Sequence, residues 1–276
     1  MNAVTPNAEV WIGRSPASML IPAVWSLLAR EWLRFLRQRN RIIGALGAPI
    51  LFWVLFGSGF GASFRPPGMD GGMDYLAYFF PGAILLVILF TAIFSSISII
   101  EDRNAGFLQG VLVAPVPRLA IVLGKVLGGA TLGFAQGMLL LPLAPLVGVS
   151  LDLGQVAVVA VELLLIATML SAIGFLFAWR MDSVQGFHAV MNLLLFPMWM
   201  LSGAFFPASG AAGWIRVVMA VNPLSYGLSS LRSAMFAQEE VAALGDPGYW
   251  TSLSVLLGVT VVMIGLAVWA VRAPKS

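Results

Sequence analysis

The sequence contains no cysteine and only one histidine, and charged residues make up only 10% of its 276 positions. Without cysteine, disulfides and thiolate metal sites are excluded, and cysteine usage says nothing about the redox compartment. A soluble domain carries about a quarter charged residues, so this chain lacks the polar surface needed to stay dispersed in water. The single histidine, His188, has no second histidine or cysteine with which to complete a zinc site, and we interpret it as structural.

Several other functional signatures are also missing. No phosphate-binding loop of the form Gly-x-x-x-x-Gly-Lys-Ser/Thr occurs, because Gly124-Lys125 is followed by Val126 and lacks the upstream glycine. No Ser/His/Asp set can be proposed with geometric support, so we expect no intrinsic enzyme and no cofactor or metal bound by this chain. The net charge of +3 comes from basic residues at the ends of apolar runs, which favours membrane orientation over nucleic-acid binding.

Long apolar runs dominate what is present. Hydrophobic residues make up 60% of the chain, and its mean hydropathy is +0.95. An α-helix needs about 20 apolar residues to cross the hydrocarbon core of a bilayer. Six runs with at most one charge each meet this length, at about residues 42–60, 75–100, 120–150, 154–179, 184–205 and 249–271. The sequence therefore predicts an all-α polytopic membrane protein, with a leader at 1–40 and a transmembrane domain at 41–272.

The predicted topology follows from charge and from turn residues. Six spans place both termini on one side of the membrane, and most basic residues fall on that side, so both termini are predicted to be cytoplasmic. Residues 206–236 are apolar but broken by proline and glycine, which predicts short helices at the outer face that dip partly into the membrane. The first apolar run follows a long polar leader with no small-residue cleavage site, so no removable signal peptide is predicted.

Two cytoplasmic segments are neither span nor simple loop. From Ala17 to Asn40, apolar residues recur at helical spacing, while Arg30, Arg34 and Arg37 lie three or four residues apart. This pattern predicts an amphipathic helix at the membrane surface that binds anionic headgroups, with a merely basic leader as the alternative.

Residues 101–118 join the second and third spans. Their acidic start is expected to suit the positive end of a short helix, and Pro115 and Pro117 prevent its continuation. By itself this predicts only a structured cytoplasmic loop.

The 101–118 segment, which ends in Leu112-Val113-Ala114-Pro115-Val116-Pro117, resembles the signature loop of ABC-2 type transporter permeases. Three further features resemble landmarks of that family in the same order. These are Phe80-Pro81-Gly82, Leu201-Ser202-Gly203-Ala204-Phe205-Phe206-Pro207, and Asn222-Pro223-Leu224-Ser225-Tyr226 followed by Leu231-Arg232. The resemblance covers residues 17 to 272.

The resemblance implies a half-transporter of the class that exports drugs, nodulation factors and polysaccharides. Two copies would form the pathway in a prokaryotic plasma membrane, and two separate cytoplasmic ATPase subunits would bind ATP and Mg²⁺. The segment after the fifth span would form re-entrant helices that close the outer end. The 101–118 loop would be the coupling helix, and the helix before the first span would brace it. The implied coupling residues are Glu101, Asp102, Arg103, Gly106, Phe107, Leu108, Gln109, Val111, Leu112, Pro115, Pro117 and Arg118. Many relatives carry glutamate where this chain has Gln109, so a charge contact there is in doubt.

Two features inside the spans leave alternatives open. Glu162 is the one ionisable side chain well inside a span, which makes it either a functional group or a packing residue. Glycines of the third span, from Gly124 to Gly137, indicate close helix packing or sliding during transport.

We expect the membrane subunit of an ATP-driven exporter of a lipid-linked, glycan or amphipathic, drug-like compound. An ion-coupled secondary transporter and a non-transporting membrane scaffold are the alternatives. The sequence does not identify the substrate, and it does not decide between a homodimer and a heterodimer with a related permease.

Overall fold

The computed structural model describes residues 16–60 and 73–272, and within these ranges the chain is helical, with 11 α-helices and no strand. The first 15 residues of the predicted leader lie outside the described residues. Six helical segments are long and apolar enough to cross a membrane, which confirms the predicted all-α fold with six spans. They are α2 (Arg39–Phe60), α3 (Tyr75–Asn104), α5 (Arg118–Leu140) with η4 (Leu141–Val147), α6 (Leu153–Arg180), α7 (Val184–Trp199) with η5 (Met200–Ala204), and α11 (Tyr249–Arg272).

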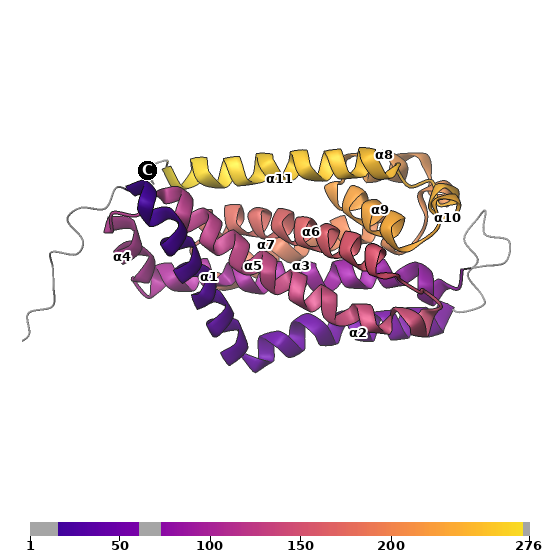
Figure 1. Ribbon diagram of the computed structural model, residues 1–276, viewed down its shortest axis with the longest axis horizontal. Coiled ribbons are helices and arrows are strands. Elements are labelled where there is room, and N and C mark those ends of the chain that lie inside the picture. Colours follow the sequence, from indigo (N-terminus) through magenta and orange to yellow (C-terminus); the bar gives the residue numbers. More distant parts are fainter. Residues whose placement is uncertain (1–15, 61–72, 273–276) are drawn as a thin grey trace, which may run out of the picture.

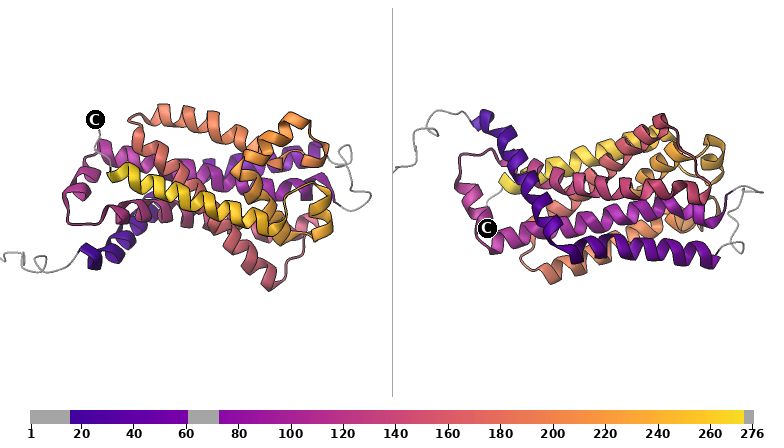
Figure 2. Two further views of the ribbon diagram at one scale, coloured as in Figure 1. Left: turned by 90° about the horizontal axis from the view of Figure 1, so that it is seen from above. Right: turned by 60° about the horizontal axis from the view of Figure 1, so that its bottom comes forward.

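The spans run side by side along the long axis of the molecule (Figure 1). One end carries the short helix α4 (Phe107–Val113), the start of α1 (Leu20–Arg37) and the end of α11. The opposite end carries α8 (Gly213–Val221), α9 (Pro223–Met235) and α10 (Gln238–Ala243). Two further views show the same separation (Figure 2). Both described ends of the chain therefore lie at the α4 end, as an even number of spans requires.

Two spans end in tighter or irregular turns, for identifiable reasons. Pro142 and Pro145 remove backbone donors beyond α5, and the chain continues as the 3-10 helix η4. The fifth span loses its regular form at η5, where Gly203 has a φ of 97°. That left-handed conformation is one that glycine adopts without steric cost. The third predicted span is thus an α-helix only to Leu140, and the fifth only to Trp199.

Helix α3 lies at the centre of the bundle. From Tyr75 to Ile100, every residue except Leu76, Phe90 and Phe94 is buried. Glycines let the neighbouring helices approach it closely: a Cβ on Gly174 of α6 would lie 2.2 Å from Ser96 Oγ, and one on Gly129 of α5 would lie 2.8 Å from Ser95 Oγ. The close-packing interpretation of the third span is therefore confirmed at these sites.

Helix α1 lies obliquely across the α4 end and packs on α5 (Figure 1). A Cβ on Gly124 would lie 2.6 Å from Leu27 Cβ, and one on Gly128 would lie 2.9 Å from Glu31 Cβ. The predicted single helix from Ala17 to Asn40 is shorter, because the chain leaves helical geometry at Gln38 and α2 begins at Arg39. The outward side of α1 carries exposed apolar residues. They are Ile21, Trp25, Leu33 and Leu36.

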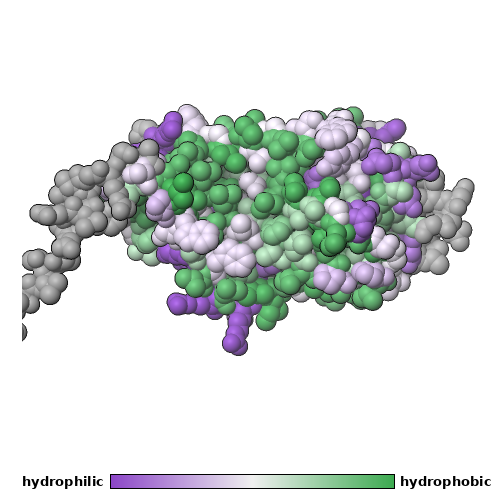
Figure 3. Space-filling view, in the orientation of Figure 1, coloured by the Kyte–Doolittle hydropathy of each residue, from purple (hydrophilic) through white to green (hydrophobic). Residues whose placement is uncertain are grey.

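On the face seen in Figure 3, hydrophobic residues cover much of the middle, and hydrophilic ones lie at the two ends of the bundle and at the corner between α1 and α2. An apolar surface of this extent suits acyl chains and not water.

Candidate functional site

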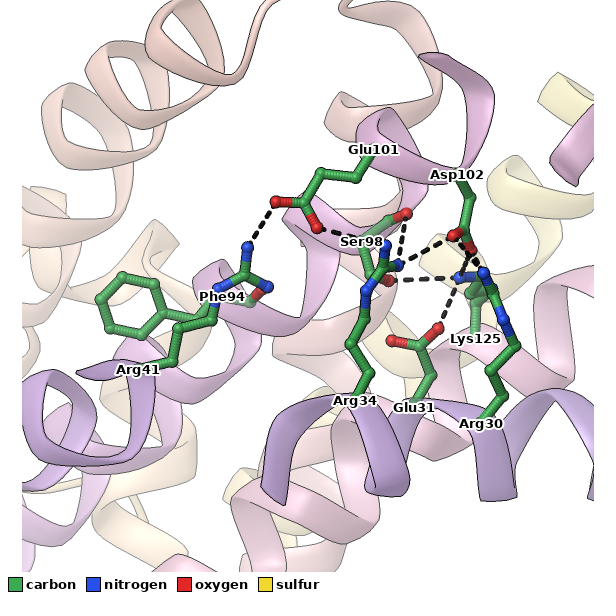
Figure 4. Close-up of polar contacts among 9 residues, drawn as sticks. All are labelled: Arg30, Glu31, Arg34, Arg41, Phe94, Ser98, Glu101, Asp102 and Lys125. Atoms are coloured by element: carbon green, nitrogen blue, oxygen red, sulfur yellow. Dashed lines mark hydrogen bonds and ion pairs between the residues drawn. The ribbon is translucent and has the colours of Figure 1, made fainter. Parts of the chain in front are cut away.

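A buried charge network lies at the α4 end of the bundle, where the end of α3 meets α1 and α5 (Figure 4). Its centre is Asp102, whose side chain is fully buried in the last turns of α3. Arg30 of α1 donates to both Asp102 carboxylate oxygens, at 2.5 and 2.8 Å, and Arg34 donates to one of them at 2.8 Å. Lys125 of α5 donates to Asp102 as well. One carboxylate therefore joins three helices.

The network has a second carboxylate, Glu31, which α1 holds at 3% side-chain exposure. Lys125 Nζ donates to Glu31 Oε1 at 2.5 Å and to Ser98 Oγ at 3.2 Å. A buried charge is costly unless it is paired and hydrogen-bonded, and Lys125 has a carboxylate on each side. We call Arg30, Glu31, Arg34, Asp102 and Lys125 the Asp102 network.

Glu101 lies beside this network and also contacts it, with 3.5 Å between Arg34 Nη2 and Glu101 Oε2. It accepts from Arg41 of α2 at 2.6 Å, and Arg41 also donates to the Phe94 backbone carbonyl at 3.3 Å. The sequence-based expectation that Glu101 and Asp102 begin a short helix is wrong, because they lie in the last turns of α3. Negative charge is unfavourable at that end of a helix dipole, and the arginines of α1 and α2 offset it.

The arginines of α1 therefore divide into two groups. Arg30 and Arg34 point inward to Asp102 and do not face lipid headgroups as expected, and the hydrogen bond to Asp102 raises the pKa of the Arg30 guanidinium. Arg37 is exposed, as is Arg39 at the corner between α1 and α2. These two remain available to anionic headgroups.

Arg103 and Arg118, two of the implied coupling residues, bind the ends of other helices. Arg103 donates to the Trp179 carbonyl at 2.7 Å and to the Asp182 carboxylate at 2.8 Å, at the end of α6. Arg118 donates to the Val271 carbonyl at 2.8 Å, at the end of α11. Cations stabilise helix carboxyl ends, where carbonyls lack intrahelical partners. In this structure both side chains hold the bundle together.

Helix α4 follows a left-handed Gly106, with a φ of 76°, which turns the chain away from α3. The expectation that Phe107, Leu108, Val111 and Leu112 share one face toward a partner is wrong for Leu108. That side chain is 2% exposed and belongs to the core of this chain. The face of α4 turned away from the core consists of exposed residues, of which only Leu112 belongs to the expected face. They are Gln109, Gly110, Leu112 and Val113, with Pro115 just beyond the helix.

Phe107 connects α4 to the Asp102 network. The Arg30 guanidinium carbon lies 3.6 Å from the centre of the Phe107 ring, a cation–π contact. Beside this contact, α4 and α1 enclose a groove of about 580 Å³. Its lining is almost entirely apolar and includes Pro22, Leu27, Phe107, Val111 and Pro115. Helix α4 therefore contacts α1 directly, and it is linked to α3 and α5 through Arg30 and Asp102.

The other sequence landmarks meet at the α8–α10 end. Trp199 Nε1 donates to the Gly82 carbonyl at 2.8 Å, and a Cβ on Gly82 would lie 2.8 Å from Ala204 Cβ. Asn222 Nδ2 donates to the Met198 carbonyl at 2.6 Å. Residues 80–82, 201–207 and 222–226 thus form one contact region around the irregular end of the fifth span.

Arg232 completes this contact region. Its side chain is 1% exposed, and it donates to the Gly203 carbonyl at 2.8 Å and to Asp246 at 2.9 Å. Its guanidinium carbon lies 4.4 Å from the Tyr78 ring centre, and the Tyr78 hydroxyl donates to the same Gly203 carbonyl. The carbonyl freed by the Gly203 kink therefore has two side-chain donors. The landmark motifs in the sequence indicated this region. Nothing in the sequence indicated that Arg232 would pair with Asp246.

Comparison with known proteins gives these two sites their context. The family model for the ABC-2 type transporter matches residues 22–236. The chain belongs to this family. Among its relatives, the daunorubicin resistance ABC transporter permease protein DrrB1 of Streptomyces coeruleorubidus is 22% identical over 246 residues, which cover 86% of this chain and 81% of the relative. The inner membrane transport permease YadH of Escherichia coli K12 is 26% identical over 226 residues, covering 79% and 86%. A putative transport permease ycf38 of Cyanophora paradoxa is 26% identical over 215 residues, covering 77% and 73%.

As an ABC-2 type permease, the chain is a multi-pass membrane transport protein whose family works with an ABC ATPase subunit. Within residues 16–60 and 73–272, no group of three metal-ligating side chains occurs.

The permease keeps one carboxyl inside a span: Glu162 of α6 is fully buried, and neither of its oxygens has a hydrogen-bond partner of good geometry among the described residues. The Tyr249 side chain at the start of α11 lies close enough to interact with it electrostatically.

Proposed function

We propose that this permease is the membrane subunit of an ATP-driven exporter that moves an amphipathic, drug-like, glycan or lipid-linked compound outward across a prokaryotic plasma membrane. Two copies would act together with two cytoplasmic ATPase subunits. The permease itself binds no cofactor in this proposal, and ATP with Mg²⁺ binds to the ATPases.

The observation that carries the proposal is the position of Phe107. It belongs to the exposed helix α4, yet it packs against Arg30, which Asp102 of α3 holds with two hydrogen bonds. An ATPase bound to the exposed side of α4, at Gln109, Leu112 and Val113, would press on the same helix that contacts the Asp102 network. A solvent loop with no partner would have no reason to expose Val113 at 86% beside an apolar groove.

The proposed orientation places the α4 end in the cytoplasm. Both described chain ends lie at that end of the bundle (Figure 1), and so do the basic residues that the positive-inside rule would retain there. These include Arg37, Arg39, Arg118 and Arg272. The α8–α10 end, with Arg232 inside it, would then face outward and close the pathway.

The relatives support the export of amphipathic compounds. DrrB1 is named for daunorubicin resistance. A probable doxorubicin resistance permease, DrrC of Mycobacterium tuberculosis, is 24% identical to this chain over 241 residues. A permease with a largely apolar surface and few charges inside its spans suits a substrate that partitions into the bilayer.

The test is purification of the tagged, full-length permease from its native membrane, followed by reconstitution into vesicles. We expect an ABC ATPase to co-purify, ATP hydrolysis to depend on that subunit, and daunorubicin to serve as a first transport probe. Partner-free permease that hydrolyses ATP, or a permease that transports with an ion gradient and no ATPase, would overturn the proposal. A reporter fused to the carboxyl terminus and labelled from outside would overturn the orientation.

A further inference from the structure

The α8–α10 end of the permease carries two polar pockets that differ in charge. One pocket, of about 450 Å³, has Asp74 and Glu240 in its lining and no basic residue. The other, of about 250 Å³, lies between α8, the first turn of α9 and the loop at 245–247. Its lining includes Arg216, and we call it the Arg216 pocket. Of the two, only the Arg216 pocket offers a cation to a ligand.

Arg216 brings a positive charge that no other residue neutralises within the described part of the chain. Its side chain is exposed on α8, and among the described residues it forms neither an ion pair nor a hydrogen bond. Asp246 also lines the pocket, but it accepts a hydrogen bond of 2.9 Å from the buried Arg232. Since that pair is neutral as a whole, the pocket keeps the charge of Arg216.

Ser225 adds a hydroxyl that also lacks a partner. The residue lines the Arg216 pocket, is 6% exposed, and its Oγ has no hydrogen-bond partner among the described residues. A buried hydroxyl without a partner is unfavourable, and folded proteins contain few of them. Ser225 lies in the first turn of α9, which begins at Pro223, and the amides and dipole at a helix amino terminus favour an anion. An anion in the pocket would therefore have three favourable partners.

The surface next to the pocket is apolar and suits acyl chains. Trp214, Val217 and Val221 of α8 lie at helical spacing and are exposed by 67%, 65% and 75%. Trp250, near the beginning of α11, is 76% exposed at the same end of the bundle (Figure 1). Tryptophans in contact with a membrane typically lie at the level of the lipid headgroups. The Arg216 pocket thus lies beside the apolar side of an amphipathic helix, at headgroup level.

We infer that the Arg216 pocket binds the phosphate group of an amphipathic molecule, a phospholipid headgroup or a lipid-linked phosphate, whose hydrocarbon chain lies on the apolar side of α8. A guanidinium binds a phosphate through two parallel hydrogen bonds. The inference rests on the proposed function for its leaflet. With the α8–α10 end facing outward, the site holds a phosphate in the outer leaflet, where an exported amphipathic compound would arrive.

The test measures lipid retention by native mass spectrometry of the full-length permease purified in detergent. The probes are phosphatidylglycerol and a diacylglycerol with the same acyl chains but no phosphate. We expect phosphatidylglycerol to bind more tightly. Arg216→Gln should weaken its binding by roughly tenfold or more, as expected for a hydrogen bond to a charged group, and Ser225→Ala by about threefold or more. Arg216→Lys keeps the charge and should retain part of the affinity.

Gln238→Glu is the matched control for charge. Like Arg216→Gln, it makes the same end of the permease more negative by one unit, but at an exposed residue outside the pocket. Phosphatidylglycerol binding should not change in this variant. Equal weakening by Gln238→Glu, unchanged binding by Arg216→Gln, or equal binding of the two lipids would overturn the inference.

The unfolding midpoints of the lipid-free variants separate binding from folding. Arg216→Gln removes no contact with a described residue, and Ser225→Ala removes a hydroxyl without a partner, so neither change should lower the midpoint. A lower midpoint together with weaker lipid binding would give these residues a structural role and overturn the site.

Two competitors identify the source of the phosphate. Stronger competition by farnesyl phosphate than by a second phospholipid would assign the pocket to a lipid-linked compound, and the reverse order would assign it to a phospholipid headgroup. Both results support the inference, whereas equally strong competition by inorganic phosphate would overturn it. Recovery of the co-purifying ATPase is measured in the same preparations. Normal recovery with a failed Arg216 test would refute the pocket and leave the exporter function intact, and lipid binding that depends on Arg216 without any ATPase would do the opposite.

Discussion

Arg30 and Asp102 lie 72 residues apart in sequence, yet the Arg30 guanidinium donates two hydrogen bonds, of 2.5 and 2.8 Å, to the Asp102 carboxylate. The pair joins the helix that precedes the first span to the helix that leads into α4. Because Arg30 also covers the Phe107 ring, this ion pair connects α4 to α3 through side chains, in addition to the direct burial of Leu108 in the core.

Asp102→Asn tests the Asp102 network. The variant keeps the shape of the side chain but removes the only negative charge shared by Arg30, Arg34 and Lys125. Loss of one partner from a buried ion cluster costs roughly 3–5 kcal/mol, so we expect a large drop in unfolding midpoint of the purified permease in detergent. Glu101→Gln is the control, since Glu101 and Arg41 are partly exposed, and it should cost much less. Equal losses in the two variants would contradict the central position of Asp102.

Phe107→Ala tests the contact between α4 and Arg30. The change removes the cation–π contact with Arg30 that holds α4 in position for the ATPase, a contact worth about 0.5–2 kcal/mol, or up to roughly thirtyfold in affinity. We expect weaker recovery of the ATPase and loss of transport, with normal membrane insertion and dimerisation. Protein level and ATPase recovery are measured together. Normal expression with normal ATPase recovery would remove Phe107 from the coupling site.

Val113→Asp and Leu108→Ala separate the two sides of α4. Val113 is 86% exposed and Leu108 is 2% exposed. A charge at Val113 should lower ATPase recovery without changing the thermal stability of the permease. Leu108→Ala should instead lower the free energy of unfolding by about 2–5 kcal/mol, because it leaves a cavity. If Val113→Asp retained the ATPase fully, the exposed side of α4 would not be the docking surface.

Much of the fold could be predicted from the sequence, because a bilayer imposes a length and an apolarity that charge-free runs display directly. All six spans were found in this way. The end of α5 at Leu140 and the kink at Gly203 were missed, since a run of apolar residues does not distinguish an α-helix from the tighter or irregular turns that proline and glycine impose.

The candidate site could be predicted only in part. The landmarks located α4 and the contact region around Gly203, but the partners of their charged residues are distant in sequence. Arg103 and Arg118 were expected at a partner subunit and instead bind carbonyls 75 or more residues away. Spacing also placed Leu108 on the same face as Leu112, whereas burial against α3 and the other spans separates them. Such pairings depend on how helices pack, which local pattern does not specify.

Arg232→Met tests the closure of the α8–α10 end. The change leaves Asp246, whose side chain is 6% exposed, without its cation, and it removes one donor from the Gly203 carbonyl. We expect a loss of roughly 3–5 kcal/mol in the free energy of unfolding. Asp246→Asn combined with Arg232→Met should recover part of it, and a double-mutant cycle in detergent measures this coupling. Strictly additive effects would show that the two side chains do not act as a pair.

Glu162→Leu and Glu162→Gln test the buried carboxyl of α6. A buried carboxyl is costly unless it is well hydrogen-bonded, and the Tyr249 side chain interacts with Glu162, so replacement of Glu162 by leucine should change the free energy of unfolding by less than about 3 kcal/mol. A residue kept at such a cost is expected to act in transport, by facing the pathway or by pairing with Tyr249 when the outer end moves. We therefore expect both variants to remain folded and to assemble with the ATPase, but to transport more slowly in reconstituted vesicles. Val158→Leu, on the exposed side of the same helix, is the control and should change neither property. Normal transport by both Glu162 variants would leave the carboxyl with a packing role alone.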